Sequence, residues 1–478
     1  MYASQVDNAA FNKESVKLSP VVETMAADLL TPLAVYLKLA ERSQHSFLLE
    51  SVEGGRQLAR YSFIGADPVE VVSGGLEAFE RVRNHLDSLS SIGVQDDAEL
   101  PPFIGGAIGY LGFDACEWFE PTLAGKGDAN EACSFMLYRS IVAFDHAKQV
   151  IRIVSLDVGE PEASGVNASS RNAEIRALLE QPLTNWPSTH AGGSENATGV
   201  PTSNWSRPDF ENAVLEIKEL INAGECYQAV LSQCFTRETT ASPIGIYRAL
   251  RSLNPSPYMF LLKFGAKTIV GASPEMLVKC EDNKLQYRPI AGTRPRGKTA
   301  AEDDAFAEEM RRDKKEVAEH LMLVDLGRND LGRVAKFGSV KVDALMTVEK
   351  YSHVQHLVSS LSAELAEGKD RFDALAACFP AGTVSGAPKV GAIEIIRGLE
   401  PTPRGVYAGA VGYFDYSGNM DTCIAIRTLV IENGVAKIQA GAGIVADSVP
   451  SAEFDETVNK AKGLMRAIDM AEGRSINS

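Results

Sequence analysis

Residues 292–299 read GTRPRGKT and satisfy the pattern G-x-x-x-x-G-K-[ST] of a phosphate-binding P-loop, so this string bears directly on the class of fold. A P-loop needs backbone N–H groups that converge on phosphate, but Arg294, Pro295 and Arg296 fill this loop and proline has no N–H. The apparent magnesium motif that follows, LMLVD at 321–325, continues a helical pattern instead of forming a buried strand. The string therefore argues against a nucleotide-binding fold.

Composition and charge indicate a large globular protein. The chain has 478 residues, 45% of them hydrophobic, and 47 Lys and Arg against 63 Asp and Glu give a net charge of -16. This charge repels nucleic acids and anionic membranes, although a small anionic substrate can still bind locally. The N-terminal segment has no apolar core of the signal-peptide kind and no run of about 18 apolar residues occurs, so we expect a cytoplasmic location. Seven scattered cysteines without C-x-x-C spacing favour reduced, mostly buried thiols.

The pattern of residues divides the chain into three parts. Residues 1–186 are strand-rich, with runs such as SFLLESV and QVIRIVSLDV bounded by glycine, proline and acidic residues, and we expect them to form antiparallel sheet. Residues 187–205 are polar and rich in Gly, Ser and Thr, which indicates a linker or mobile surface loop. A helix with Ser206 as its N-cap and Gly224 at its end then opens the region 206–478.

Two pairs of acids suggest a metal site. Glu316 and Glu319 are three residues apart on one predicted helix, and Glu453 and Glu456 have the same spacing on another near the C-terminus. Such pairs are common on solvated helix faces in an acidic chain, so each pair alone means little. If the two pairs face each other, their oxygens would suit Mg²⁺.

Glycine-rich segments and one arginine point to an anion site. The stretches FPAGTVSGAPK (379–389) and QAGAGIVADS (439–448) let backbone amides approach a carboxylate, although they could equally be tight turns. Arg427 lies in the strand-like run CIAIRTLVI and needs an anionic partner, either an acid of the protein or a substrate carboxylate. Tyr407 precedes it in YAGAVGYFD.

Three other side chains could carry chemistry. Glu275 in GASPEMLV follows a predicted strand and a proline turn, and His353 and His356 lie in the strand-like YSHVQHLVS. The two histidines could bind a metal together, but a singly ordered histidine is the commoner outcome.

Ten motifs together resemble the chorismate-utilising enzymes, and within them the large components of anthranilate synthase. The resemblance is dense over residues 206–470 and extends to LLES and RYSFIGADP in the N-terminal region. The motifs are, in order, INAGECYQAVLSQ, GASPEMLV, RPIAGTRPRG, EVAEHLMLVDLGRND, HVQHLVS, FPAGTVSGAPK, GAVGYF, IAIRT, GAGIVADS and EFDETVNKA.

The resemblance implies both a fold and a set of site residues. The fold is α+β, with large antiparallel sheets flanked by helices in α/β layers and an active site in a cleft. It implies Mg²⁺ held by Glu316, Glu319, Glu453 and Glu456. It implies that Glu275 is the general acid, that His356 assists loss of pyruvate, and that Thr383 lines the ring pocket. Substrate-binding residues implied by the resemblance are Gln228, Gly292, Thr293, Tyr407, Arg427, Gly441, Ala442 and Gly443.

The implied reaction is amination of chorismate beside its ring carboxylate, followed by loss of pyruvate. Relatives that add water carry a lysine base where this chain has Gln228, and a neutral amide cannot deprotonate water. Relatives that make aminodeoxychorismate read PIKGT where this chain has Ala291, so aminodeoxychorismate synthase remains the alternative enzyme. Cys234 departs from the arginine usual in the family, which puts local contacts in doubt.

The resemblance also implies partners and regulation. No cysteine lies in a nucleophile-elbow context, so ammonia would come from glutamine through a separate glutaminase subunit, in a heterotetramer. L-Tryptophan would inhibit by feedback. A non-catalytic tryptophan-binding protein on the same fold is the alternative of another class. The residues implied for tryptophan are Glu50, Ser51, Pro257, Tyr258 and Met259.

Overall fold

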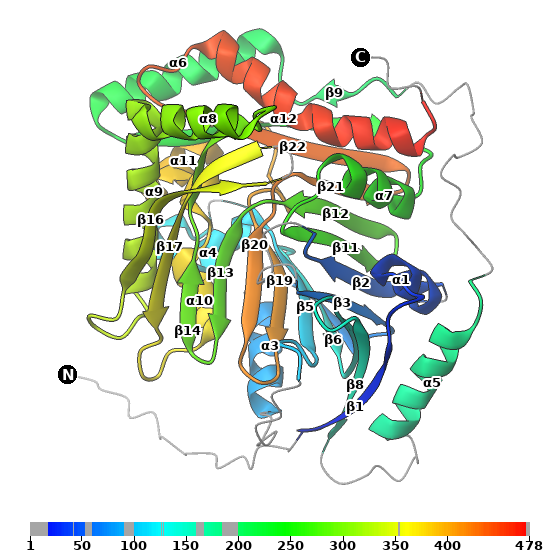
Figure 1. Cartoon of the computed structure of the whole chain (residues 1–478). Helices are drawn as coiled ribbons and strands as arrows, with labels where there is room; N and C mark the ends of the chain where they lie inside the picture. Colours follow the sequence, from blue (N-terminus) through cyan, green and yellow to red (C-terminus); the bar gives the residue numbers. More distant parts are fainter. Residues whose placement is uncertain are drawn as a thin grey trace.

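The computed structural model describes residues 18–474 with internal gaps, and these residues form two large antiparallel sheets with helices outside them (Figure 1). The gaps, together with the two ends, lie at 1–17, 42, 53–59, 90–99, 126, 128, 159–166, 184–198, 352–353 and 475–478. No helix among the described residues combines the length and apolar character needed to cross a membrane.

The first sheet, called sheet A here, takes strands from both ends of the chain. Its central junction is the pairing of β2 with β11, in which Leu48 lies opposite Leu261. In spatial order the strands are β1 (Leu18–Ala26), β8 (Val150–Val158), β7 (Ser140–Asp145), β3 (Tyr61–Ala66), β2 (His45–Glu50), β11 (Tyr258–Phe264), β12 (Lys267–Ser273), β21 (Thr428–Glu432), β22 (Val435–Ile444), β10 (Gln228–Glu238) and β18 (Gly386–Ala387), with β9 (Thr202–Ser203) beside β10.

The second sheet, sheet B, is built in the same way. Its junction is the pairing of β5 with β19, which again joins an N-terminal strand to a C-terminal one. In spatial order its strands are β15 (Ile290–Pro295), β17 (Val354–Glu364), β14 (Lys284–Tyr287), β13 (Met276–Glu281), β20 (Met420–Ile424), β19 (Ala410–Asp415), β5 (Gly106–Leu111), β6 (Cys133–Tyr138) and β4 (Glu70–Gly74), with β16 (Lys341–Lys350) beside β17.

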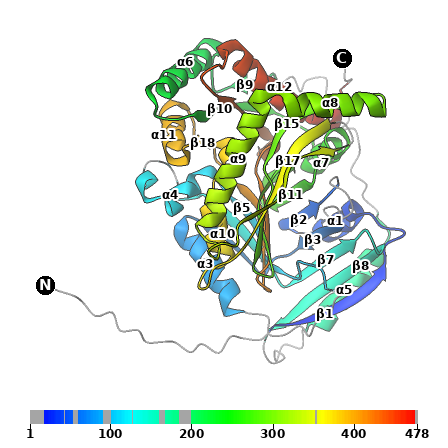
Figure 2. The same cartoon turned by 60° about the vertical axis from the view of Figure 1, so that its left-hand side comes forward.

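Helices cover the outer faces of the sheets (Figure 2). Long α12 packs on β22 and against α7 and α6, while α9 packs on β15 and β17. Helix α6 follows ordinary capping rules at both ends, since Ser206 accepts a hydrogen bond from the Asp209 amide at its start and Gly224 ends it with a φ of 86°. Helix α12 begins after Val449 without a side-chain cap. The helices are α1 (Pro32–Ala40), α3 (Leu76–Ser88), α4 (Cys116–Phe119), α5 (Ala168–Glu180), α6 (Arg207–Ala223), α7 (Pro243–Leu253), α8 (Ala300–Arg312), α9 (Lys314–Gly332), α10 (Arg371–Cys378), α11 (Lys389–Leu399) and α12 (Pro450–Ala471), and the 3₁₀ turns are η1 (Phe113–Ala115), η2 (Pro121–Leu123) and η3 (Gly382–Val384).

The central strands of sheet A are buried on both faces, and their residues alternate between two cores, whereas the edge strand β1 is exposed at alternate positions. Phe47 and Phe260 face the core shared with sheet B, whereas the neighbouring Leu48 and Leu261 face the core under α1, α7 and α12. Successive strand residues point to opposite faces, so a strand between two cores is apolar throughout. This explains unbroken runs such as FLL in β2.

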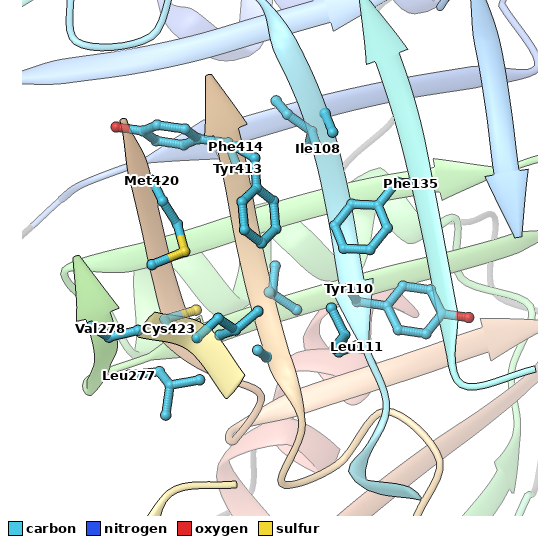
Figure 3. Packing of buried hydrophobic residues seen from close by; sticks show 14 of the residues in the cluster. Ile108, Tyr110, Leu111, Phe135, Leu277, Val278, Tyr413, Phe414, Met420 and Cys423 are labelled. Atoms are coloured by element: carbon cyan, nitrogen blue, oxygen red, sulfur yellow. The ribbon is translucent and has the colours of Figure 1, made fainter. Parts of the chain in front are cut away.

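Sheet B packs around the larger core. Tyr413 and Phe414 of β19 lie between β5 and β20, with Phe135 of β6 and Met420 of β20 nearby (Figure 3). Phe414 also stacks on Phe372 of α10 with ring centroids 4.3 Å apart, which fixes that helix on the sheet. The α+β fold with large antiparallel sheets and flanking helices is therefore confirmed.

The regions 1–186 and 206–478 meet in both sheets. The junction strands β2 and β5 come from the first region, and β11 and β19 come from the second. Most of the predicted linker, up to residue 198, lies outside the described residues.

The P-loop-like string forms the end of β15 and the turn into α8. Its turn is occupied by an acid of the chain itself, because the Gly297 amide donates to Asp303 at 2.6 Å and Arg296 pairs with the same carboxylate at 2.7 Å. The apparent magnesium motif lies within α9, where Asp325 pairs with Arg328 at 3.0 Å. Both observations agree with the rejection of a nucleotide site.

Candidate active site

The candidate site forms where the chain passes from one sheet to the other. Glu275 lies between β12 of sheet A and β13 of sheet B, and Arg427 lies between β20 of sheet B and β21 of sheet A. The crossings are joined by backbone hydrogen bonds, from the Ala272 amide to the Arg427 carbonyl at 3.1 Å and from the Ile424 amide to the Glu275 carbonyl at 3.0 Å. The general-acid candidate and the cationic candidate are thus held by one rigid junction.

Arg427 differs from the strand-like expectation for CIAIRTLVI. The run is broken after Ile424 and resumes at Thr428, and Arg427 has a φ of 51°, in the left-handed region that non-glycine residues avoid. Burial lowers the pKa of its guanidinium, and no carboxylate of the described residues forms an ion pair with it. A strained, half-buried arginine without such a pair is a site for an anionic ligand.

Two backbone N–H groups of β22, those of Gly441 and Gly443, are not used in pairing with β10. On β10, the amides of Val230 and Ser232 point away from β22 and donate to Ser385 and Glu400. In an antiparallel pair, two opposite residues either both point their amides at each other or both point them away. Gly443 and Gly441, which lie opposite Val230 and Ser232, therefore point their own amides away from β10. On that side β21 pairs with β22 only as far as Ile438, so no described strand covers these glycines. The Gly441 amide meets the Tyr407 hydroxyl instead.

Neighbouring side chains leave no room for a Cβ atom at Gly441 or Gly443. A Cβ on Gly441 would lie 2.8 Å from the Tyr407 hydroxyl, and one on Gly443 would lie 2.5 Å from Nε2 of Gln228. Oε1 of Gln228 is buried and has no hydrogen-bond partner in the described chain. Ala442 turns its side chain to the core beneath α6, so only its backbone faces the site. The backbone at positions 441 and 443 therefore admits only glycine, which leaves its N–H groups accessible to a candidate anion.

Glu275 is set up as an acid. Its side chain is buried, and burial raises its pKa from 4.5 to about 8, although hydrogen bonding by Thr383 and the charge of Lys460 act in the opposite direction. A carboxyl group with this pKa is protonated at neutral pH and can donate a proton.

His356 has a defined tautomer. Its Nδ1 lies 3.0 Å from the Gly292 carbonyl and 3.1 Å from Oγ1 of Thr293. Because a carbonyl only accepts, Nδ1 carries the proton and the lone pair of the neutral ring is on Nε2. Gly292 has a φ of 62°, and a Cβ there would approach Glu316 to 3.2 Å, so the histidine and the first acid pair are close. His353 lies outside the described residues.

The two acid pairs lie on α9 and α12, close enough for the charge of Glu456 on α12 to act on Glu319 of α9. Burial raises the pKa of Glu319, and the charges of Glu316 and Glu456 raise it further. Burial and the charge of Glu456 likewise raise the pKa of Glu453. Lys460, which the sequence analysis missed, lies 2.7 Å from Glu456 and donates to the Gly441 carbonyl at 2.9 Å. Its position four residues after Glu456 on a helix was the available signal.

These acids suit a hard cation. Within the described ranges, no three His, Cys, Asp or Glu side chains are close enough together to hold a metal. Charges within the set nevertheless raise the pKa values of Glu319 and Glu453, and a divalent cation with oxygen ligands would relieve that repulsion. The chemistry of these four carboxylates therefore suits Mg²⁺, although their positions in the described chain are not close enough to coordinate an ion together.

A separate cavity of about 1220 Å³ lies between the two sheets. The five residues expected to bind tryptophan all line it: Glu50, Ser51, Pro257, Tyr258 and Met259. Glu50 is buried and accepts hydrogen bonds from Tyr247 and from Nε of Arg251 at 3.1 Å. The Ser51 hydroxyl is buried without a hydrogen-bond partner in the described chain.

Cys234 lies on β10 opposite Gln439, and its amide donates to Asn204 at 2.8 Å. All seven cysteines are unpaired, and six are buried. The expectation of mostly buried thiols is thus confirmed.

The comparisons with known proteins agree with this geometry. Residues 44–466 match the family described as chorismate binding enzyme. A relative from Acetivibrio thermocellus is 44% identical over 502 residues, covering 98% of this chain and 99% of its own, and one from Thermus thermophilus is 44% identical, covering 95% and 99%. Both are named anthranilate synthase component 1.

Solved structures show the same architecture. Anthranilate synthase component I from Streptococcus pneumoniae is 34% identical with a TM-score of 0.76, covering 92% of this chain and 99% of its own. The menaquinone-specific isochorismate synthase from Escherichia coli has a TM-score of 0.72 at 20% identity, covering 95% of each chain, and so shares the fold.

Proposed function

The chain belongs to the chorismate binding enzyme family, and on that premise we propose that it converts chorismate and ammonia into anthranilate and pyruvate, the first committed step toward tryptophan. The observation that carries the proposal is the junction of the two sheets. It brings together a protonated carboxyl group, an arginine without an ion-pair partner in the described chain and a glycine-rich strand edge, opposite a pair of acid-bearing helices.

In the first step, ammonia attacks the ring carbon beside the carboxylate, and the ring hydroxyl leaves. The new C–N bond forms as the allylic C–O bond breaks, and Glu275 gives its proton to the departing oxygen, which leaves as water. The raised pKa of Glu275 supplies that proton at neutral pH.

In the second step, pyruvate is lost and the ring becomes aromatic. The ring proton at the aminated carbon is removed while the C–O bond to the enolpyruvyl group breaks, and the enol carbon gains a proton to give pyruvate. Nε2 of His356 carries the lone pair that assists this step, because Nδ1 is held by Gly292. Arg427, Tyr407 and the Gly443 amide hold the enolpyruvyl carboxylate throughout.

The ring carboxylate needs a counter-charge. Glu316, Glu319, Glu453 and Glu456 would hold Mg²⁺, which when bound binds the ring carboxylate and cancels its repulsion by these acids. In this proposal Gly292, Thr293 and Thr383 line the ring pocket.

Two residues distinguish this reaction from its relatives. Gln228 lies against Gly443 and has no basic group with which to activate water. Ala291 in β15 offers no amine where aminodeoxychorismate synthases carry lysine. The lysine side chain that aminodeoxychorismate synthases carry is therefore absent at Ala291.

Ammonia in the cell is supplied, in this proposal, by a glutaminase partner with which the chain forms a heterotetramer. The name component 1 given to the relatives implies such a second component. We place the enzyme in the cytoplasm, where seven unpaired thiols stay reduced.

Feedback inhibition by L-tryptophan belongs to the cavity between the sheets. The buried Ser51 hydroxyl and the Glu50 carboxylate offer polar partners beside the apolar Pro257 and Met259, which suits an amino acid with a large aromatic side chain. On this proposal the region 1–186 contributes regulation, 187–205 is the linker, and 206–478 carries catalysis.

The test uses the purified chain with chorismate, Mg²⁺ and ammonium salt at alkaline pH, where free ammonia is available. Fluorescent anthranilate and pyruvate should appear in equal amounts, and a partner glutaminase should let glutamine replace ammonium. Aminodeoxychorismate without pyruvate, or isochorismate, would contradict the proposal. Absence of turnover with intact tryptophan binding would favour a non-catalytic sensor.

A further inference from the structure

A buried ion pair lies directly behind the candidate anion site. The Arg404 side chain is 2% exposed and that of Glu400 is 4% exposed. The pair is bidentate, with Nε of Arg404 2.8 Å from Oε2 of Glu400 and Nη2 2.7 Å from Oε1. Neither residue was identified from the sequence. A buried pair of this kind adds little to stability by itself, so its presence calls for another role.

The rest of the Arg404 guanidinium binds two backbone carbonyls. Nη1 donates to the carbonyl of Val384 at 2.7 Å, and Nη2 donates to that of Val230 at 2.6 Å. Val384 follows Thr383 in η3, and Val230 pairs with Gly443. Arg404 therefore joins the backbone segments that carry the ring-pocket threonine and the edge opposite the anion-binding amide.

The same guanidinium contacts the third part of the site. Its carbon lies 5.6 Å from the ring centroid of Tyr407 and 4.5 Å from that of Phe113. Glu400 extends the network, because its Oε1 accepts hydrogen bonds from the amide of Ser232 at 2.8 Å and from its hydroxyl at 2.7 Å. The donors of Arg404 are thus directed to the surroundings of Thr383, Gly443 and Tyr407.

We propose that Arg404, oriented by Glu400, is the positioning residue that sets the spacing of Tyr407 and Gly443 at the enolpyruvyl carboxylate relative to Thr383 at the ring. It does not touch the substrate. The inference rests on the proposed function and deepens it by identifying what holds one end of the site in place. Small misplacements of binding groups have large kinetic effects, so loss of this pair should weaken chorismate binding more than it weakens the fold.

The test replaces the pair in the full chain with a neutral one, R404M together with E400Q. The glutamine introduced by E400Q can still accept from Ser232, and removing both charges avoids leaving one buried without a partner. A matched control exists at the other end of β10, where Arg237 lies 3.0 Å from Glu472 and both side chains are 4% exposed. R237M together with E472Q removes a buried pair at a site remote from Gly443. Arg237 also pairs with Asp469 and Glu472 with Arg474, and these two remaining partners lie 3.9 Å from each other, so the control also leaves no lone charge.

We expect the KM for chorismate of the R404M and E400Q variant to rise by about tenfold or more, with a smaller change in kcat. The R237M and E472Q control should lose a similar amount of stability in urea and keep its KM. An unchanged KM in the folded variant would overturn the proposal, whatever its kcat.

Two further measurements keep the result decisive. If the double variant does not fold, R404K retains the charge but not the planar fork, and its KM should also rise; an unchanged KM in R404K would overturn the proposal. Equilibrium binding of chorismate to the wild-type chain separates the two levels of inference. Failure of the wild type to bind or convert chorismate would refute the proposed function, whereas normal wild-type binding with an unchanged variant refutes only the role of Arg404.

Discussion

At the residue scale, the chemistry depends on one carboxyl group whose burial changes its protonation. Glu275 is identified from its motif, but its pKa of about 8 arises from the two sheets that close around it. The sequence contains the acid and not its burial, because burial is a property of segments far apart in the chain. The same holds for the tautomer of His356, which Gly292 fixes from a neighbouring strand.

Glu275→Gln should change how stability depends on pH. The folded carboxyl has the higher pKa, so the folded state binds more protons than the unfolded state between pH 4.5 and about 8, and wild-type stability falls as pH rises through that window. Glutamine cannot ionise, so at alkaline pH the variant should gain on the order of a few kcal/mol relative to wild type. Urea unfolding at a series of pH values measures this.

The control is Glu432→Gln at the exposed end of β21, because the Glu432 carboxylate is already solvated.

Anthranilate formation by Glu275→Gln should fall by about 10² to 10⁴ fold. If the free energy of unfolding changed with pH in the same way in Glu275→Gln and in wild type, the pKa of Glu275 would not be raised by folding, and the stability prediction would be wrong.

Ser51→Phe should weaken inhibition by L-tryptophan, because the new ring occupies the cavity that an indole would fill. Ser51→Ala is the matched variant, which removes the hydroxyl but leaves the space. Inhibition curves should shift far more for phenylalanine than for alanine. Equal inhibition of wild type and Ser51→Phe would place tryptophan elsewhere.

At the scale of elements, the helices could be predicted and one strand could not. A capping residue and periodicity located α6, and periodicity alone located α9 and α12, which carry the two acid pairs. The run CIAIRTLVI reads as one strand because it is apolar throughout, yet it is divided between two sheets at Arg427. Hydrophobic periodicity reports burial but not the sheet in which a residue is buried.

Glu319→Gln should make the chain less dependent on Mg²⁺ for stability. A metal that binds only the folded state raises the melting temperature, and wild type should show this shift. In the variant one repelling charge is gone, so its melting temperature without Mg²⁺ should equal or exceed that of wild type, and the shift should shrink. Thermal unfolding at increasing Mg²⁺ measures both effects.

The exposed Glu308→Gln on α8 is the control, since Glu308 pairs only with Arg311 and Arg312 in the described chain. It should retain the wild-type response to Mg²⁺. Identical Mg²⁺ shifts for Glu319→Gln and wild type would exclude Glu319 as a ligand.

At the scale of the whole molecule, the two regions suggested by composition share both sheets. The polar segment at 187–205 is evident in the sequence, but the pairing of β2 with β11 and of β5 with β19 is not, because alternation of apolar residues identifies a strand without naming its neighbour. No local pattern in the sequence predicts the order of the strands within the two sheets.

A protease site inserted between residues 187 and 198 should leave the two pieces together after cleavage. Each sheet contains strands from both pieces, so separation would break two complete strand pairings and expose the shared core. Cleaved protein should elute as one species and keep its activity, while wild type treated with the same protease is the control. Elution of two separate folded pieces would contradict the shared sheets.

The shared sheets also impose an order on synthesis. Strand β5 leaves the ribosome roughly 300 residues before its neighbour β19, which at about 5 to 20 residues per second is a delay of roughly 15 to 60 seconds. During that time β5 can pair with β6 on one side but its other edge has no partner, and contacts between such distant segments form slowly. Strand β2 pairs with β3 on one side and waits roughly 210 residues for β11 on the other. The nascent N-terminal half is therefore a natural client for chaperones, and its exposure ends only when the last third of the chain has been translated.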